Sequence, residues 1–202
     1  MGAWITETLD LDGAVVPVPL VLEKCTLVED VSLHACTLPG LYLSGSQLPA
    51  LTAQHLICQG SLYLRHGFLA MEKIDLAGAK ITGQLDCCGG RFFAGNVALN
   101  CYAVKVGIGV SLSREFVAAG AIVLDQAEIS GVLDLSGAAM LIGISAIGMR
   151  VRGWLLWKDV KVEGIKFELK GAHVGTLFDT PGSWKPVKHL VLSSFRYDRI
   201  ES

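Results

Sequence analysis

The sequence is short of charge, and it has no apolar run long enough to cross a bilayer. Only 18% of its 202 residues are charged, whereas 51% are hydrophobic, which is a high apolar fraction for a protein of this size. The longest apolar stretch, from Gly137 to Met149, is shorter than the about 20 residues that a membrane-spanning helix needs. We therefore expect no membrane span, and the apolar residues must fill a protein core.

A secretory signal and a metal-binding cysteine motif are also missing. Residues 1–7 contain no basic residue ahead of an apolar segment, so the sequence predicts a cytoplasmic protein. The six cysteines lack C-x-x-C spacing, and no histidine stands near them at the spacing of zinc ligands. We expect reduced thiols, no metal site and no cofactor.

An excess of basic charge is absent from the whole chain, whose net charge is −2. This argues against strong nucleic-acid binding. However, residues 1–60 carry six acidic residues and one basic residue, whereas residues 145–202 carry ten basic and six acidic residues. If the chain advances along one axis, it has an acidic end and a basic end. The uneven charge can be chance variation on solvated faces. It can also serve end-to-end association of the protein, or binding of an acidic partner at the basic end, and both interpretations remain open.

What the sequence does contain is an internal repeat of 48 residues. Residues 58–90 match residues 106–138, and almost every matched position is apolar, Ala or Gly. The positions between them vary freely, as at Lys73 and Ala121. A repeat that preserves apolar positions while the rest drifts indicates a conserved core and a variable surface.

A shorter pattern of 10–13 residues lies within each repeat, with the form L-x-L-x-x-A-x-I-x-G. In L-x-L both leucines point to the same side of a strand. Strands this short, bounded by glycine, suit the faces of a coil that climbs one strand spacing, about 4.8 Å, per turn. Two patterns make one four-sided coil, so the 48-residue repeat is two coils. Amphipathic helices are excluded, because the 23 glycines would interrupt them.

The segments Gly60–Phe68 and Ile74–Cys87 resemble a group of bacterial repeat proteins that often carry the label "membrane-associated oxidoreductase". The resemblance covers residues 9–200. More distantly, the chain is similar to pentapeptide-repeat proteins, which form right-handed quadrilateral β-helices, although its pattern is nearer eleven residues than five. The resemblance implies right-handed winding.

The prediction is therefore an all-β, right-handed parallel quadrilateral β-helix, pentapeptide-repeat-like, with about seven coils. Residues 1–180 form the β-helix domain. Residues 181–202, which begin with Pro181 and Gly182, form a C-terminal cap, since an open coil would expose strand edges and core.

The oxidoreductase label finds little support in motifs. Gly107-Ile108-Gly109 is the nearest match to a dinucleotide fingerprint, but Leu112 stands where its third glycine should be. We expect the cysteines to be core residues. The repeat-matched Asp86 and Asp134 could form a paired acid site, but we expect each to be an outward residue of a ladder or to form a hydrogen bond at a corner. No catalytic residue is assigned.

Aromatic and basic residues outside the repeat are the candidate interaction site. We expect Trp157 to lie in the interior and Trp154 to face outward among basic neighbours, where an exposed Trp suits a protein interface. The alternative is that these aromatics only cover the end of the core. The candidate interaction residues are Arg150, Arg152, Trp154, Lys158, Trp184, Phe195 and Tyr197.

The sequence therefore predicts a non-catalytic β-helical scaffold, or protein-interaction module, whose partner is an unknown protein. A homodimer through one end of the β-helix is a further expectation. Two alternatives remain: a DNA mimic that acts on a topoisomerase, which would need a continuous acidic face, and an oxidoreductase. The fold alone does not decide among them.

Overall fold

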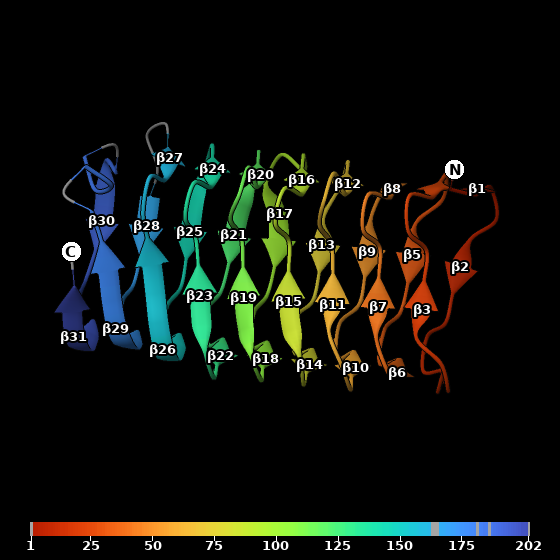
Figure 1. The fold of residues 1–202 in the computed structure, drawn as a ribbon, viewed down its shortest axis with the longest axis horizontal. Coiled ribbons are helices and arrows are strands. Elements are labelled where there is room, and N and C mark those ends of the chain that lie inside the picture. The colour runs from red at the N-terminus through yellow and green to blue at the C-terminus, as the bar shows by residue number, and fades with distance from the viewer. Residues whose placement is uncertain (1, 163–165, 181, 186, 202) are drawn as a thin grey trace.

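The chain folds into a parallel β-solenoid of about eight turns, as the computed structural model shows (Figure 1). The structure describes residues 2–162, 166–180, 182–185 and 187–201. These residues form 31 strands and no helix, and every strand pair is parallel. Within this described part, no helix is long and apolar enough to cross a membrane. The all-β parallel solenoid is confirmed, while the right-handed winding and the quadrilateral cross-section stay predictions.

Two of the sheets are simple ladders that each gain one short strand per coil. The strands of the first are β1 (Trp4–Ile5), β4 (Thr26–Leu27), β8 (Gln47–Leu48), β12 (Leu69–Ala70), β16 (Arg91–Phe92), β20 (Val117–Ala118), β24 (Ala139–Met140) and β27 (Lys161–Val162). The strands of the second are β2 (Leu9–Asp10), β5 (Val31–Ser32), β9 (Leu51–Thr52), β13 (Ile74–Asp75), β17 (Val97–Asn100), β21 (Ala121–Val123), β25 (Gly143–Ser145), β28 (Lys166–Glu168) and β30 (His189–Val191).

The third sheet consists of two ladders that merge near the C-terminus. One ladder contains β3 (Leu20–Val21), β7 (Leu41–Tyr42), β11 (Leu62–Tyr63), β15 (Gln84–Asp86), β19 (Gly109–Ser111) and β23 (Val132–Asp134). The other contains β6 (Thr37–Leu38), β10 (Ile57–Cys58), β14 (Lys80–Ile81), β18 (Lys105–Val106) and β22 (Glu128–Ile129). Both continue into the longer strands β26 (Arg150–Trp157), β29 (His173–Asp179) and β31 (Arg196–Glu201).

The strand register confirms that the 48-residue repeat spans two coils. Leu62 pairs with Leu85, and Leu85 pairs with Val110. The repeat partners Leu62 and Val110 are therefore two rungs apart on one ladder. The coil between them carries the same kind of residue at the same place, so the interior column is apolar at each rung.

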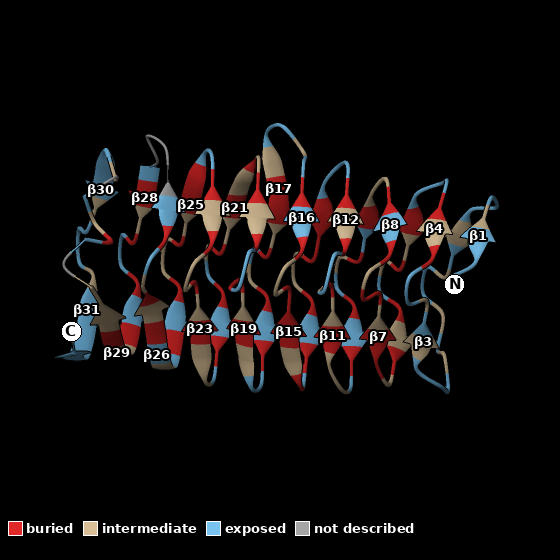
Figure 2. Ribbon diagram, turned by 45° about the horizontal axis from the view of Figure 1, so that its top comes forward, coloured by how far each residue is buried: buried red, intermediate tan, exposed pale blue. Residues whose placement is uncertain are grey.

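Alternation along each strand separates the core from the surface (Figure 2). Leu62 is fully buried, whereas its neighbour Tyr63 is only partly buried and stacks on Tyr42 of the previous coil. The corners between ladders need positive φ, and Gly45 supplies it at φ 69°. Non-glycine residues such as His55 and Ala103 adopt the same conformation, so the corners favour glycine without requiring it.

Three phenylalanines of successive coils pack on one another inside the solenoid. The rings of Phe68 and Phe92 are 5.5 Å apart, and those of Phe92 and Phe116 are 5.2 Å apart. All three side chains are fully buried. In the strand register, however, Phe92 pairs with Ala70 and Ala118, so the large side chain of the middle coil stands where its neighbours have a small one.

The middle coil reverses the order of large and small residues. Gly90, Phe68 and Phe116 occupy the same corner position, because the N–H of each donates to the carbonyl oxygen three residues earlier. In the middle coil the large residue, Phe92, comes two positions after this corner. A Cβ atom on Gly90 would lie 2.9 Å from the ring of Phe92. Large and small residues therefore interlock between coils, as close packing of a narrow core requires.

The C-terminal segment from residue 182 both continues the solenoid and covers its interior. Strands β30 and β31 extend two ladders by one more rung. Between β29 and β30, Trp184 packs against the buried rings of Trp157, at 5.2 Å, and Phe167, at 5.9 Å. The turn is held by a bond from Nε1 of Trp157 to the carbonyl oxygen of Ser183, at 3.0 Å. Residues 189–201 therefore belong to the coil, and the covering element is the short turn around Trp184.

Candidate functional site

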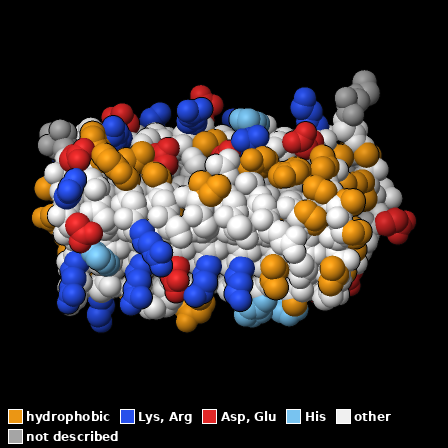
Figure 3. All heavy atoms as spheres, turned by 60° about the horizontal axis from the view of Figure 1, so that its bottom comes forward, with side chains coloured by type: hydrophobic (Ala, Val, Ile, Leu, Met, Phe, Trp, Pro, Cys, Tyr) orange, Lys and Arg blue, Asp and Glu red, His pale blue; other side chains and the backbone are white. Residues whose placement is uncertain are grey.

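One column of outward side chains along the solenoid is predominantly basic. It consists of the first residues of β14, β18, β22, β26, β29 and β31, which the register places side by side: Lys80, Lys105, Glu128, Arg150, His173 and Arg196. We call this column the charged row; all six residues are exposed. Adjacent strands lie about 4.8 Å apart, so the row is roughly 24 Å long. Figure 3 shows Lys and Arg side chains side by side along one edge towards the C-terminal end.

Both carboxylates in and beside the row already have a partner. Nζ of Lys105 lies 3.1 Å from Oε1 of Glu128. Nε2 of His173 lies 2.9 Å from Oδ1 of Asp198. No carboxylate of the described residues lies within ion-pair distance of Arg150, Arg152 or Arg196. The surface therefore has three guanidinium groups available to a ligand.

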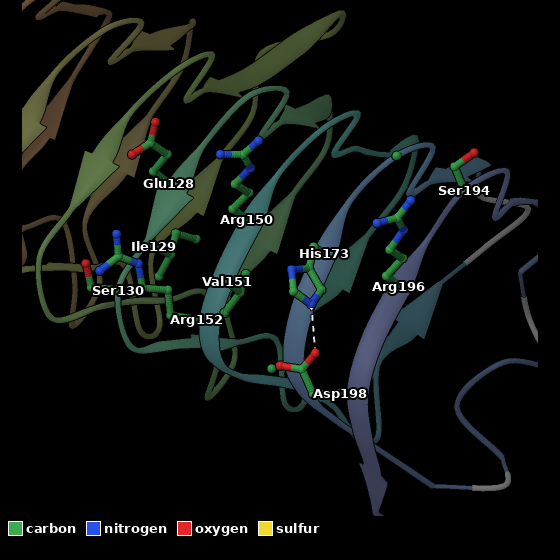
Figure 4. Close-up of a pocket in the computed structure, with 12 residues that line it drawn as sticks. Glu128, Ile129, Ser130, Arg150, Val151, Arg152, His173, Ser194, Arg196 and Asp198 are labelled. Atoms are coloured by element: carbon green, nitrogen blue, oxygen red, sulfur yellow. Dashed lines mark hydrogen bonds and ion pairs between the residues drawn. The ribbon is translucent and has the colours of Figure 1, made fainter.

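A groove of about 650 Å³ lies among these three arginines, and we call it the arginine groove. Arg150, His173 and Arg196 stand along one side of it, as Figure 4 shows. The second outward position of each strand contributes Arg152 and Asp198. The groove is thus an open, positively charged trough on the strand surface rather than an enclosed cavity.

A smaller hollow of about 280 Å³ prolongs the arginine groove towards the N-terminus. It is lined by Lys80, Thr82, Lys105 and Gly107, and it shares Glu128 and Ser130 with the larger groove. The charged row therefore borders a continuous track from β14 to β31.

The structure divides the predicted interaction residues among separate places. Arg150 and Arg152 line the arginine groove. Trp154 faces outward as expected, with 39% of its surface exposed, and it stacks on Phe178 at 6.4 Å. Lys158 lies over the same Phe178 ring, with Nζ 3.6 Å from the ring centre, a favourable cation–π distance. This aromatic pair with its lysine is a second, smaller feature next to the groove.

The remaining candidates belong to the C-terminal end of the coil. Trp184 is half-buried against the core, and its Nε1 donates to Oδ2 of Asp179. Phe195 and Tyr197 contact each other at 6.0 Å between ring centres. Tyr197 is 48% exposed and continues the column of the buried Val174. None of these three lines the arginine groove.

The repeat-matched aspartates do not meet. Asp86 pairs with Ser111, and Ser111 pairs with Asp134, so one rung separates the two carboxylates. Each accepts a corner hydrogen bond, from the N–H of Cys88 at 3.0 Å and from that of Ser136 at 2.9 Å. The structure confirms the corner bonds, and a paired acid site is absent there.

Asp75 is the most buried carboxylate among the described residues, with 2% of its surface exposed. It accepts hydrogen bonds from the side chains of Gln54 and Asn100, both at 2.9 Å, and forms an ion pair with Lys73 at 2.8 Å. Burial by itself raises its pKa, but the bonds from Lys73, Gln54 and the N–H of Ala77 outweigh it and lower the pKa below the ordinary value. Because these oxygens are occupied by the protein, the network is structural.

Five of the six cysteines are core residues, as predicted, whereas Cys88 is not. All six thiols are free, and five are buried; Cys88 is partly exposed. Burial raises the pKa of Cys58 and Cys101, and it raises the pKa of Cys87 well above the ordinary value. Such thiols are poor nucleophiles.

The glycines of the dinucleotide-like segment have a packing role. A Cβ atom on Gly107 would lie 2.1 Å from the carbonyl oxygen of Thr82, and one on Gly109 would lie 2.8 Å from that of Val132. Both residues lie at or within strands of the ladder, and no helix follows in the described chain. Close contact between coils therefore accounts for both glycines.

Sequence reasoning missed most of the charged row. Of the row it predicted only Arg150, and of the residues beside the row it predicted Arg152 but not Asp198. The row members that it missed are Lys80, Lys105, Glu128, His173 and Arg196. A signal for the row exists: the spacing from Arg150 to His173 to Arg196 is one coil each, as the register shows. Aligning residues coil by coil, rather than by the two-coil repeat, would have exposed it.

A scan against protein-family models and searches of curated proteins and solved structures find no match to this chain. The fold places the chain in the class of parallel β-solenoids.

Proposed function

We propose that this protein is a non-catalytic scaffold that binds an acidic segment of another protein along the charged row. The observation that supports it is the regular placement of basic side chains on successive rungs. Each is held by a strand whose alternate residue is fixed in the core, so the spacing of the charges is preset. A rigid surface of this kind loses little conformational entropy when it binds.

The chemistry of the surface favours recognition of acidic groups. Five of the six residues in the row are basic or histidine. Arg150 and Arg196 of the row, together with Arg152 beside it, have guanidinium groups suited to carboxylate and phosphate geometry. This is the reverse of the acidic face that DNA mimicry needs. An excess of basic residues at one end of an otherwise slightly acidic chain suits a short acidic segment better than a long nucleic acid.

As part of the proposal we place the protein in the cytoplasm, where free thiols persist; the six free cysteines support this. The likeness to bacterial β-helical repeat proteins is compatible with a scaffold.

The test compares the capture of proteins by the purified chain and by two variants of equal charge. The row variant carries Lys80→Gln, Arg150→Gln and Arg196→Gln. The control variant carries Arg91→Gln, Lys161→Gln and Lys188→Gln, which are exposed residues away from the row. We expect a protein that wild type and control capture and the row variant does not.

That protein is then purified, and its affinity for the three chains is measured by calorimetry at increasing salt. We expect direct binding that weakens at least about tenfold in the row variant and falls with salt. Equal capture by the row and control variants overturns the proposal. Captured material that is lost after nuclease treatment overturns it as well, because the ligand is then a nucleic acid.

A further inference from the structure

We propose that the arginine groove binds the phosphoryl group of a phosphorylated side chain on the partner protein. This inference rests on the proposed function and specifies which chemical group the scaffold recognises. It follows from the number of unpaired cations, the hydroxyl groups beside them and the shape of the groove.

The cations exceed what a carboxylate requires. One arginine suffices to bind both oxygens of a carboxylate, which carries a single negative charge. Here Arg150, Arg152 and Arg196 line one groove, and none of them has an acidic partner among the described residues. A phosphorylated side chain carries nearly two negative charges and three strong acceptor oxygens, so it matches a site with three guanidinium groups.

The acids at the groove do not neutralise these arginines. Oδ1 of Asp198 lies 2.9 Å from Nε2 of His173, and Oε1 of Glu128 lies 3.1 Å from Nζ of Lys105. Their nearest charged partners therefore lie within the row itself.

Neutral donors complete the set. Ser130 and Ser194 line the groove, and each has a hydroxyl group that can donate a hydrogen bond. In Figure 4 Ser130 lies beside Arg152, at the opposite side of the groove from Ser194. Because β22 and β31 are three rungs apart, or about 14 Å, one phosphoryl group meets only one of these two hydroxyls. That hydroxyl can donate to a phosphate oxygen that the arginines leave unpaired.

The strand in the middle of the groove contributes a glycine to the lining. Gly175 of β29 lines the groove, opposite the shifted register of β26 between Val151 and Trp154 and beside the strand that carries Asp198. A Cβ atom at this position would lie 2.3 Å from the carbonyl oxygen of Arg152. The two backbones approach closely where the register shifts between Val151 and Trp154, and this approach requires glycine. The smaller hollow beside Lys80 and Lys105 then receives residues that flank the phosphorylated one, and its lysines favour acidic residues there.

The first experiment uses inorganic phosphate as the probe and acetate at equal ionic strength as the comparison. Side-chain Nε–H signals of the arginines are followed by NMR. We expect phosphate to shift the signals of Arg150, Arg152 and Arg196 in a saturable way, while acetate does not. A variant with all three changed to Gln should bind phosphate at least about tenfold more weakly, and the control variant Arg91→Gln, Lys161→Gln, Lys188→Gln should bind as wild type does. Equal effects of phosphate and acetate, or phosphate shifts confined to arginines outside the groove, overturn the inference.

The second experiment treats the captured partner with a phosphatase and repeats the calorimetric titration. We expect at least about a tenfold loss of affinity for wild type and little further loss for the variant that lacks the three arginines. If affinity survives dephosphorylation but is still lost in the row variant, the scaffold proposal stands and the phosphate inference is overturned. If no protein binds the control variant more tightly than the row variant, the proposed function is overturned. In that case the phosphoryl group that the groove binds does not belong to a partner protein.

Discussion

Replacing Phe92 with alanine tests whether large and small residues interlock between coils. Phe92 is fully buried between the rings of Phe68 and Phe116. Its neighbour along the interior is Gly90, which has no side chain that could move into the vacated space. A buried Phe→Ala change costs about 3–5 kcal/mol, and the cost is highest where the site cannot collapse. We therefore expect a loss of about 4–5 kcal/mol.

The adjacent Phe93 is the matched control, because it has the same side chain but is 43% exposed. Phe93→Ala should change the stability by less than about 1 kcal/mol. Unfolding in urea, followed by circular dichroism, gives the free energies of both variants and of wild type.

The refuting result is a similar, small loss in both variants. It would mean that the middle coil is loosely packed and that the reversed order of Gly90 and Phe92 has no energetic role. A large loss for Phe93→Ala alone would contradict the assignment of the inward and outward faces.

Three further predictions follow from single contacts. Asp75→Asn should lower the free energy of unfolding by about 1–3 kcal/mol at pH 7. The pKa of Asp75 is lowered in the folded protein, so its carboxylate stabilises the fold above the unfolded pKa of about 3.9. This stabilisation is lost as the pH falls through the folded pKa. Urea unfolding should therefore show the gap between Asp75→Asn and wild type narrowing below about pH 4, and a gap that is constant with pH would refute the role of the Lys73 and Gln54 bonds. Under native conditions a maleimide should label Cys88 first, with the buried thiols labelled only on unfolding; equal labelling of all six, measured by mass spectrometry, would contradict the core assignment. Gly107→Ala should lower the melting temperature by several degrees, since its Cβ would lie 2.1 Å from a backbone oxygen, and an unchanged melting temperature would show that the coils separate easily.

The solenoid could be predicted because its core is repetitive. An inward residue such as Leu62 has the same environment on every rung, so the two-residue alternation and the 48-residue match both record it. Trp157 was predicted to lie in the interior because it matches an inward position of the repeat, and its exposed fraction is 0%. The reversal at Gly90 and Phe92 escaped prediction, because it breaks the repeat in one coil and is compensated only by packing between coils.

The candidate site was harder to predict for a physical reason. Outward residues are under no packing constraint, so they differ between copies of the repeat. The internal match that revealed the core therefore gives no information about the surface residues. Arg150 was found for its proximity to Trp154 in sequence, whereas Arg196 joins it only through the parallel register across two rungs. The continuation of the coil through β31 was missed because Pro181 and Gly182 suggest a break.

The most direct test of the central claim is to locate the bound partner on the solenoid surface. Lysines are acetylated in the free protein and in its complex with the captured partner, and each site is quantified by mass spectrometry. We expect Lys80 and Lys105, on the charged row, to lose most of their reactivity in the complex, whereas Lys161 on the first sheet keeps its reactivity. Protection of Lys161 with unchanged reactivity of Lys80 and Lys105 would contradict the account, because the partner would then bind a different face.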